Sequence, residues 1–381
     1  MIQPPGPVAR PLRIAVIGTD GMPARYGGFE TCVEQLAPRL ARRGHSTEVF
    51  GSSVGRTVRA RSEARLAHRY LPLRANGLWS VPYDLLNFLI CWRRVDAMLV
   101  MGVSGGIFMP WLRRVAGARR LIVNVDGLEA RRDKWTGLKR WFLERSEALA
   151  IRHAHVVVSD NQGIADVVLA RHGRTSTVIA YGCDHVLRLP PGDAQVLVHE
   201  RFGLAPGGYL LTVARIEPEN QIAEMLQAFL ASPQPLYVLV GNFSGTPLGR
   251  ELLVRYQGEP RIRFIDSLFD PRALAALRAC CHIYLHGHSV GGTNPSLVEM
   301  LPYQRPLLAF DCSFNRYTLD GEGGYFADVP SLTRQLQQPA LQAWVPAPAL
   351  AQSPCYRWEA IADAYEALCR ADASDPAGAL P

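Results

Sequence analysis

Long hydrophobic runs are missing from this 381-residue chain. No apolar stretch reaches the roughly 18 residues that a membrane-spanning helix needs, so the sequence predicts no such helix. The first ten residues are rich in proline and contain no apolar core, so we expect no secretory signal there. Lysine is also scarce, because only Lys134 and Lys139 are lysines among the 41 Lys and Arg residues. This shortage indicates a general preference for arginine and excludes no function by itself.

The eight cysteines lack the spacing of a metal site. None belongs to a Cys-x-x-Cys pair or to a Cys/His ligand pattern, so we expect reduced thiols in a cytosolic protein. The chain also lacks the Gly-x-Gly-x-x-Gly fingerprint of dinucleotide-binding domains, since Gly18 and Gly21 precede a long insertion. Glu48 lies inside a predicted strand rather than at its end, which leaves an NAD enzyme with little support.

Basic residues concentrate in the first half of the chain. Residues 1–180 carry 27 Lys and Arg against 14 Asp and Glu, a net charge of +13, whereas residues 181–381 carry −6. A preference for arginine does not explain this asymmetry, which suggests that the first half faces an anionic surface. No nucleic-acid-binding motif accompanies the charge, so we expect no nucleic acid and favour an anionic membrane or a lipid pyrophosphate.

Strand and helix patterns alternate along the chain, which is typical of parallel sheets with right-handed crossovers. The patterns predict strands at 12–18, 47–51, 96–102, 120–126, 155–159, 175–180, 209–214, 236–241, 262–265, 282–285 and 306–310. They predict helices at 29–43, 105–115, 135–154, 162–171, 219–231, 271–280, 296–303 and 358–369. A Gly- and Pro-rich linker at 181–207 interrupts the alternation. The expected fold class is therefore α/β, with two Rossmann-like domains whose parallel sheets face each other across a cleft.

The segment from His286 to Glu299 carries most of the functional information. After a predicted strand, small and polar residues lead into the predicted helix: Gly291, Gly292, Thr293, Asn294 and Ser296. A helix start with a glycine-rich lead-in binds anions through free N–H groups and the helix dipole. Glu299 follows inside the helix among apolar residues, where a carboxylate needs partners. Ribose hydroxyls or a structural hydrogen bond would supply them.

Two other turns join a predicted strand to a predicted helix. Gly27 and Gly28 open the first helix, where they would cradle a phosphate or admit a substrate hydroxyl, or else form an ordinary turn. Arg215 follows the strand at 209–214. Its guanidinium would clamp a diphosphate there, or lie solvated at the surface.

Carboxylates follow the strand at 120–126. Asp126 and Glu129 are candidate substrate-binding groups, and Asp126 is a possible base, although an Asp-Gly turn explains the pattern equally well. Basic residues alternate with aromatic ones over 131–145. This mixture is typical of a helix that lies on an anionic lipid surface, but the aromatic residues would equally serve packing.

Taken together, these segments resemble the family-four glycosyltransferases of the GT-B fold, which are retaining and metal-independent. The similarity is greatest to the rhamnosyltransferase-like members of bacterial exopolysaccharide and capsule assembly. The matching segments are GMPARYGGFET (21–31), DGLE (126–129), RDKW (132–135), SDNQGI (159–164), YG (181–182), RIEPEN (215–220), HGHSVGGTNPSLVE (286–299) and WEAIA (358–362).

The resemblance implies that different parts of the chain bind the acceptor and the donor. Residues 1–185 would bind the acceptor, 186–345 would bind the nucleotide-sugar donor, and 346–381 would hold a crossing segment, a helix that returns to the first domain and a flexible tail. The donor-binding residues would be Gly27, Gly28, Arg215, Asn220, Gly291, Gly292, Thr293, Asn294, Ser296 and Glu299, with Arg215 on the diphosphate, backbone N–H groups of 292–296 on phosphate and sugar, and Glu299 on the ribose. The acceptor-binding residues would be Tyr26, Asp126 and Glu129, and the catalytic ones Arg215 and Asp126.

Three positions depart from the wider family. Asn220 replaces a lysine, Gly291 replaces a glutamate, and Asp126 stands where a cleft histidine is usual. The first two changes resemble the rhamnosyltransferase-like branch, so we expect them to affect the donor sugar rather than to abolish activity.

The expected activity is therefore transfer of a sugar, best guessed as L-rhamnose from dTDP-rhamnose, to a lipid-linked saccharide with retention. The resemblance implies no cofactor and no metal. It also implies a peripheral location on the inner face of the cytoplasmic membrane. Three alternatives stay open: a sugar-nucleotide epimerase of the same fold, a non-catalytic nucleotide-sugar or lipid-binding scaffold, and an NAD enzyme.

Overall fold

The structure, a computed structural model, describes residues 10–24, 27–55, 62–117, 119–125, 137–338 and 345–371. Contacts divide these residues into two compact units. Unit 1 takes in residues 10–160, 165–179 and 359–371, and unit 2 takes in residues 161–164 and 180–358. Each unit therefore combines segments that are distant in the sequence. Among the described residues, no helix is both long enough and apolar enough to cross a membrane.

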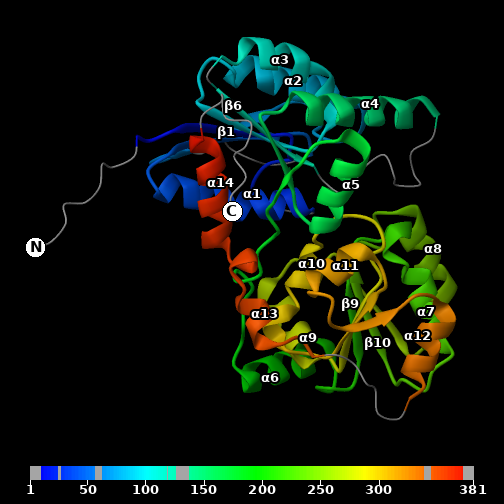
Figure 1. Cartoon of the computed structure of the whole chain (residues 1–381). Helices are drawn as coiled ribbons and strands as arrows, with labels where there is room; N and C mark the ends of the chain where they lie inside the picture. The colour runs from blue at the N-terminus through cyan, green and yellow to red at the C-terminus, as the bar shows by residue number, and fades with distance from the viewer. Residues whose placement is uncertain are drawn as a thin grey trace, which may run out of the picture. The chain divides into compact units, whose positions relative to one another are not determined.

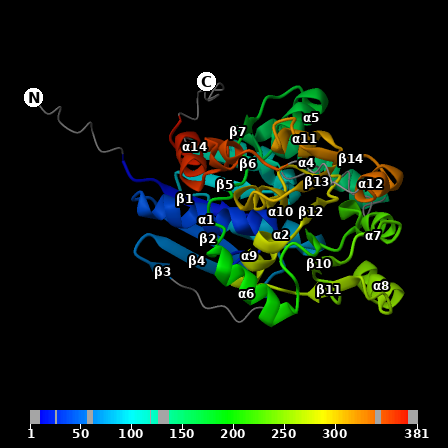
Figure 2. The same cartoon turned by 90° about the horizontal axis from the view of Figure 1, so that it is seen from below.

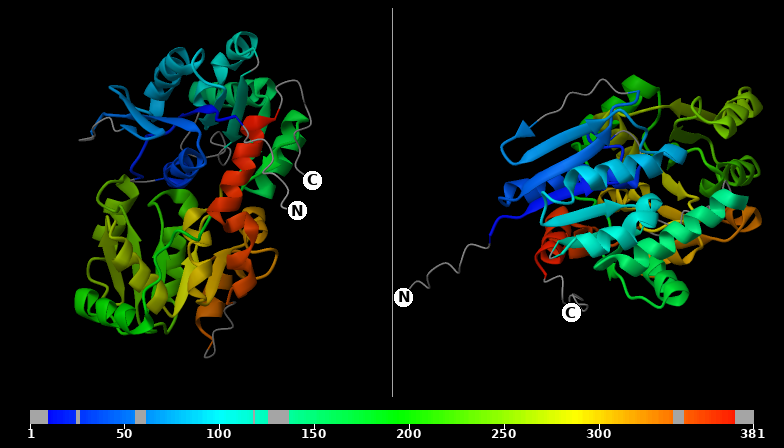
Figure 3. Two further views of the ribbon diagram at one scale, coloured as in Figure 1. Left: turned by 90° about the vertical axis from the view of Figure 1, so that its left-hand side faces the viewer. Right: turned by 90° about the horizontal axis from the view of Figure 1, so that it is seen from above.

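Unit 1 is built on an eight-stranded sheet. Its strands are β1 (Arg13–Ile17), β2 (Ser46–Ser52), β3 (Ser62–Glu63), β4 (Leu66–Leu71), β5 (Ala97–Met101), β6 (Arg120–Val125), β7 (Val156–Ser159) and β8 (Thr177–Val178). They lie in the order β3-β4-β2-β1-β5-β6-β7-β8, and every pairing is parallel except that of β3 with β4 (Figures 2 and 3). The order reverses between β1 and β5, as in doubly wound nucleotide-binding folds.

Helices pack on this sheet through apolar residues spaced three or four apart. In the first helix, Val33, Leu36 and Leu40 are fully buried, which is the spacing that predicted it. The helices that include residues of unit 1 are α1 (Gly28–Arg42), α2 (Ser80–Cys91), α3 (Met109–Val115), α4 (Gly137–His153), α5 (Gln162–His172) and α14 (Trp358–Arg370), with 3-10 helices η1 (Gly77–Trp79) and η2 (Ser104–Phe108) (Figure 1).

Unit 2 is built on a six-stranded, wholly parallel sheet. Its strands are β9 (Leu210–Val213), β10 (Tyr237–Gly241), β11 (Ile262–Asp266), β12 (Ile283–His286), β13 (Leu307–Phe310) and β14 (Gly324–Phe326). Their order is β11-β10-β9-β12-β13-β14, so the order reverses between β9 and β12. Both units thus have the same doubly wound arrangement.

The second sheet has a hydrophobic core on each face. Its helices are α6 (Pro191–Phe202), α7 (Ile222–Leu230), α8 (Pro247–Tyr256), α9 (Pro271–Cys280), α10 (Pro295–Val298), α11 (Ser313–Thr318), α12 (Val329–Leu336) and α13 (Pro348–Gln352), with 3-10 helices η4 (Pro218–Asn220), η5 (Leu301–Tyr303) and η6 (Pro354–Tyr356). Leu211 packs in the core that α6 and α9 cover, whereas Leu210 packs in the core that α7 and α12 cover (Figure 1). Neighbouring residues of a strand point to opposite faces, so each strand serves both cores.

The two parallel α/β sheets confirm the predicted fold class, and α14 packs with unit 1 as predicted. The predicted linker at 181–207 was wrong in part, because it contains α6. Pro191 occupies the first turn of that helix, where a missing N–H costs nothing. The helix predicted at 296–303 is instead α10 followed by η5, because Pro302 cannot continue an α-helix. The predicted domain bounds stay predictions.

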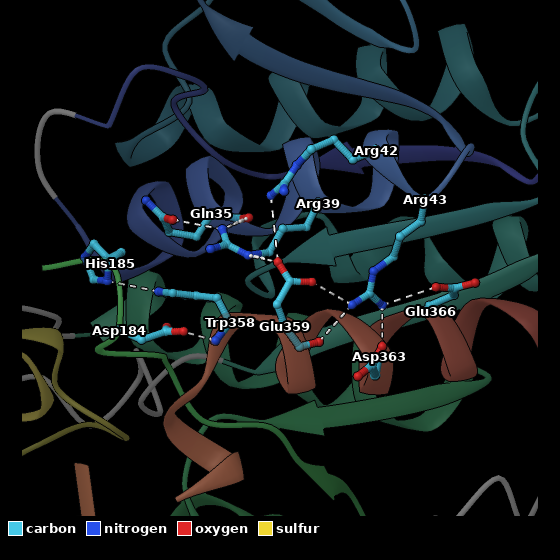
Figure 4. Close-up of polar contacts among 10 residues, drawn as sticks. All are labelled: Gln35, Arg39, Arg42, Arg43, Asp184, His185, Trp358, Glu359, Asp363 and Glu366. Carbon is cyan, nitrogen blue, oxygen red and sulfur yellow. Dashed lines mark hydrogen bonds and ion pairs between the residues drawn. The ribbon is translucent and has the colours of Figure 1, made fainter. Parts of the chain in front are cut away.

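Helix α14 is fastened to α1 by a cluster of ion pairs within unit 1 (Figure 4). Arg43 lies at the centre: its Nη1 contacts Asp363 at 2.6 Å and Glu366 at 3.2 Å, and its Nη2 contacts Glu359 at 3.0 Å. Arg39 Nε donates to the other oxygen of Glu359 at 3.0 Å. Beneath this cluster, the Tyr365 hydroxyl accepts a 2.7 Å hydrogen bond from the buried amide of Asn124 in β6. The last helix is therefore an integral part of the first unit.

We expect Arg43→Ala to lower the free energy of unfolding of unit 1 by about 1–2 kcal/mol, after allowance for solvent screening. Arg42→Ala is the matched control. The Arg42 side chain is 68% exposed, and its Nη2 lies 3.8 Å from Glu359, a longer and weaker contact than those of Arg43. This variant should change the free energy of unfolding by no more than about 0.5 kcal/mol. The hydrogen bond from Arg43 lowers the pKa of Glu359, so the stabilisation is present above the ordinary glutamate pKa and is lost as the pH falls through the lowered value. Urea unfolding at pH 7 and at about pH 3 measures both effects. Equal destabilisation by the two variants would contradict this assignment.

Candidate functional site

The motifs that the sequence singled out in unit 2 meet at one place in the sheet. Strands β9 and β12 are neighbours, and the strand order reverses between them. Ligands of doubly wound sheets bind at the carboxyl ends of the strands at such a reversal. The loop after β9 carries Arg215 and Asn220, and the loop after β12 carries Gly291 to Asn294. The fold therefore brings two segments 70 residues apart to the position where a ligand is expected.

Direct hydrogen bonds join these two loops. Asn220 Oδ1 lies 3.0 Å from Nδ1 of His288, and the backbone N–H and the hydroxyl of Ser289 both donate to the carbonyl of Glu219, at 2.9 Å and 3.0 Å. Asn220 is buried, and its Nδ2 has no hydrogen-bond acceptor among the described residues. A buried amide N–H without an acceptor is costly, so this atom is a point of local destabilisation between the two loops.

The backbone explains why a glutamate is absent at position 291. Gly291 has φ of +141°, a conformation that side chains rarely adopt. A Cβ atom built on it would lie 2.7 Å from Nε2 of His288. The buried imidazole of His288 therefore occupies the space into which a longer residue at 291 would project. A carboxylate at 291 would require a different loop.

The helix after this loop is shorter than the sequence predicted. α10 spans only Pro295–Val298, and Glu299 is the residue that ends it rather than one inside a long helix. Asn294 Oδ1 accepts the backbone N–H of Ser296 at 2.9 Å. The Ser296 N–H is therefore engaged by the chain, contrary to the expectation that it is free for a phosphate, and Pro295 has no N–H. The backbone N–H groups of Gly292 and Asn294 donate to no acceptor in the described part of the chain.

Glu299 is held from two sides. Its Oε2 forms an ion pair with Nη2 of Arg278, and its Oε1 lies 3.4 Å from Nε2 of His185. Burial alone would raise the pKa of Glu299, but the charge of Arg278 and the hydrogen bond from His185 outweigh it and hold that pKa below its ordinary value. The carboxylate is therefore ionised at neutral pH.

Sequence reasoning missed both partners of Glu299. Arg278 lies in the last turn of α9, where a basic residue reads as an ordinary helix end. His185 lies in an irregular segment 114 residues before Glu299. The one available signal was the carboxylate itself, because a buried charge demands a partner. The sequence does not say which residue supplies it.

Arg215 lies two residues after β9 and is partly buried. Within the described ranges, no hydrogen bond or ion pair engages its guanidinium. It therefore keeps its five N–H donors available at the edge of the sheet where the loops meet.

The corresponding reversal in unit 1 lies between β1 and β5. Gly27 has φ of +130° and precedes α1, and no side chain of the described residues caps the first turn of that helix. Glu30 Oε1 accepts the backbone N–H of Asp20 at 3.1 Å, and Glu34 Oε1 accepts that of Ala24 at 3.2 Å. Asp20 and Ala24 are thus held against the first turns of the helix. Gly27 and Gly28 lie at its end, as the sequence predicted.

Several predicted residues fall outside the described ranges: Tyr26, Asp126 and Glu129, together with the basic residues at 131, 132 and 134. The remainder of the basic and aromatic segment lies in α4, where Lys139, Arg140 and Arg145 are exposed and Trp141 is 60% exposed. No group of three or more His, Cys, Asp or Glu side chains in the described part could hold a metal ion. Independence of metals stays a prediction.

Residues 96–184 match the model of a family described as a domain of unknown function, DUF1972. A 165-residue segment is 24% identical to the GtfA subunit of UDP-N-acetylglucosamine–peptide N-acetylglucosaminyltransferase from Streptococcus pneumoniae serotype 4. That match covers 42% of this chain and 31% of the relative, so the chain aligns with about a third of the relative's length.

Solved structures match nearly the whole chain. Sucrose-phosphate synthase from Thermosynechococcus elongatus superposes with a TM-score of 0.78 at 18% identity, over 95% of this chain and 98% of that one. Anabaena HepE in complex with UDP and glucose gives 0.67 at 16% identity, over 93% and 98%. The catalytic domain of starch synthase IV from Arabidopsis thaliana, bound to ADP and acarbose, gives 0.68 at 14% identity, over 94% and 99%. At these identities the likeness shows the fold, and the chain has the GT-B fold.

Proposed function

We propose that this protein is a glycosyltransferase that moves a sugar from a nucleotide-sugar donor to an acceptor hydroxyl. The observation that carries the proposal is the meeting of the two motif loops at the strand-order reversal of unit 2 in a chain with the GT-B fold. A nucleotide-sugar donor is supported by the curated relative, whose name includes UDP-N-acetylglucosamine, and by HepE, which has been crystallised with UDP and with UDP-glucose.

The residues of unit 2 supply what such a donor needs. Arg215 and Asn220 present N–H groups for the diphosphate, and the backbone of 291–294 adds further donors next to the sugar. Glu299 accepts ribose hydroxyls. A carboxylate oxygen accepts more than one hydrogen bond, so each oxygen of Glu299 retains room for a hydroxyl beside its partner in the chain. In unit 1, Gly27 and Gly28 would contact the transferred sugar and phosphate.

The reaction would proceed with retention. The acceptor oxygen bonds to the anomeric carbon as the bond from that carbon to the diphosphate breaks, and the acceptor proton passes to a diphosphate oxygen on the same face. Charge then accumulates on the leaving diphosphate, so donors that stabilise this charge supply the main catalytic effect. Arg215 is the strongest such donor, and no metal ion enters the scheme. Asp126, with Tyr26 and Glu129, would position the acceptor.

The donor is best guessed as dTDP-L-rhamnose and the acceptor as a lipid-linked saccharide of exopolysaccharide or capsule assembly. Gly291 and Asn220 motivate this choice, because both replace residues of the wider family in the manner of the rhamnosyltransferase-like branch. The alternative activity on the same fold is epimerisation of the sugar nucleotide. Product analysis with the donor alone separates the two, since an epimerase converts it without an acceptor.

Arg215→Ala should raise the barrier of the transfer step by about 2–4 kcal/mol, or roughly 30- to 1,000-fold in kcat, because one donor to the developing charge is lost. Arg272→Ala, which removes an exposed arginine of α9 in the same unit, is the matched control and should keep the wild-type rate. Transfer of radiolabel from the donor to lipid-linked acceptor measures both. Turnover of Arg215→Ala at the wild-type rate would refute the role of Arg215.

We also propose that α4 binds an anionic membrane surface, which would bring unit 1 to a lipid-linked acceptor. The exposed Trp141 and Arg145 lie one turn apart on this helix, and Lys139 adds a further exposed charge. Arg140 is also exposed but pairs with Glu144 at 3.2 Å. An exposed tryptophan beside arginine side chains suits the headgroup region, where the indole is buried and the cations meet lipid phosphates.

Arg145→Glu should weaken binding to vesicles of phosphatidylglycerol and phosphatidylcholine by at least about fivefold, because each basic residue contributes about 1 kcal/mol near an anionic surface. Trp141→Ser should weaken it further. Trp111→Ser on α3 is the control, since Trp111 is also an exposed tryptophan of unit 1 at 39% exposure. Cosedimentation at two salt concentrations measures the binding. If the control variant loses as much affinity as Trp141→Ser, α4 is not the membrane surface.

A further inference from the structure

Glu299 is the middle of a line of polar side-chain contacts in unit 2. Arg278 holds one oxygen of the carboxylate, and His185 lies 3.4 Å from the other. On its far side, Nδ1 of His185 accepts a 2.9 Å hydrogen bond from Nε1 of Trp358 (Figure 4). The proposed ribose-binding carboxylate is thereby linked to the first residue of α14.

The indole fixes the tautomer of the histidine. An indole N–H is only a donor, so Nδ1 of His185 must be the acceptor in this bond. In the neutral ring the hydrogen then resides on Nε2, the nitrogen that faces Glu299. The ring therefore turns an N–H group, rather than a lone pair, toward the carboxylate. In metal sites, a hydrogen bond to one ring nitrogen of a histidine fixes which nitrogen faces the metal. Here the indole fixes in the same way which nitrogen faces the carboxylate.

The surroundings hold Trp358 in place. Its side chain is fully buried, and its backbone N–H donates to Asp184 Oδ1 at 3.0 Å (Figure 4). The backbone N–H of Cys183 donates to the carbonyl of Tyr356 at 2.9 Å. A Cβ atom at Gly182 would lie 2.8 Å from the indole ring, so the chain passes directly against it. Segments 182–185 and 356–358 thus form a brace, at two places where the chain changes unit.

The ion pair with Arg278 already gives the largely buried Glu299 an opposite charge. The contact with His185, whose tautomer is fixed, additionally orients the carboxylate group. Geometric placement within a fraction of an ångström is what distinguishes a productive site from a loose one. The brace therefore has a role beyond charge compensation.

We infer that His185 and Arg278 are positioning residues that fix Glu299 for the ribose hydroxyls of the donor, and that Trp358 sets the tautomer that His185 needs. This inference rests on the proposed nucleotide-sugar site. It adds that donor affinity depends on residues that do not touch the nucleotide, one of which begins the C-terminal helix.

The test compares donor binding and turnover of the full chain in four variants. His185→Leu should raise the donor KM, and the Kd for UDP or dTDP, about tenfold, because a hydrogen bond to a charged group is lost, and it should leave kcat within about twofold. His185→Gln should restore most of the affinity, since its side-chain amide donates to Glu299. Trp358→Phe keeps an aromatic ring but removes the N–H, and should raise KM by a smaller factor than His185→Leu. His199→Leu, which makes the same change at an exposed histidine of α6 in the same unit, is the control.

A second measurement does not depend on any nucleotide. The ¹⁵N shifts of the His185 ring, identified by their loss in His185→Gln, should report the Nε2–H tautomer in the wild type. In Trp358→Phe that tautomer should no longer predominate. If the wild-type ring carries its hydrogen on Nδ1, or if His185→Leu binds nucleotide as tightly as the wild type, the inference is wrong.

Failure of the proposed function would give a different result from failure of the positioning role. It would appear as a wild-type protein that binds no nucleotide sugar at all, and the ring shifts would then still decide whether the line from Trp358 to Glu299 exists. Thermal unfolding midpoints accompany each variant. An affinity loss that scales with the midpoint rather than with the hydrogen-bonding capacity of residue 185 would also overturn the positioning role.

Discussion

The charge of Glu299 is the constraint around which the second unit is organised. An ionised carboxylate that is largely removed from water, as Glu299 is at 15% exposure, is destabilising unless its oxygens are compensated. Breaking a buried pair by removing one partner is costlier than replacing both. Arg278 from α9 supplies the opposite charge, and His185 adds a polar contact at 3.4 Å. These partners come from separate segments. The need to compensate the charge of Glu299 therefore constrains how α9, the 182–185 segment and α10 pack together. In the proposed function, a carboxylate held in this way is preorganised to accept ribose hydroxyls.

A second fixed point lies in unit 1, where α14 meets α1. The ion-pair cluster around Arg43 is peripheral, but Tyr365 reaches the buried amide of Asn124 in β6, next to the region where acceptor-binding residues were predicted. Trp358 opens the same helix and belongs to the brace of unit 2. One helix therefore contributes residues to both units. The C-terminal motif WEAIA thus begins with the residue that contacts His185, next to the proposed site.

The sequence allowed most of the fold to be predicted, because buried parallel strands and amphipathic helices leave strong periodic signals. Two errors involve proline, which can begin a helix or interrupt one. Pro191 begins α6 inside a predicted linker, and Pro302 divides a predicted helix. For the site, a glycine-rich turn after one strand and an arginine after another identified the two loops of unit 2. The partners of Glu299 were beyond reach, since His185 and Arg278 meet it only through the tertiary fold. Gly291 was noticed as a missing carboxylate, and only the position of His288 gives that absence a physical reason.

The central claim is that the reversal point of the second sheet binds a nucleotide sugar and that the chain transfers the sugar. The most direct measurement incubates the wild-type protein with dTDP-, UDP- and GDP-sugars in turn, and records the unfolding midpoint and the transfer of labelled sugar to membrane lipid extract. At a ligand concentration of about 100 times Kd, binding adds about 2.7 kcal/mol of stability, so one donor class should raise the midpoint by several degrees and the same class should label the lipid. No stabilisation by any nucleotide sugar, together with no labelled product, would contradict the account.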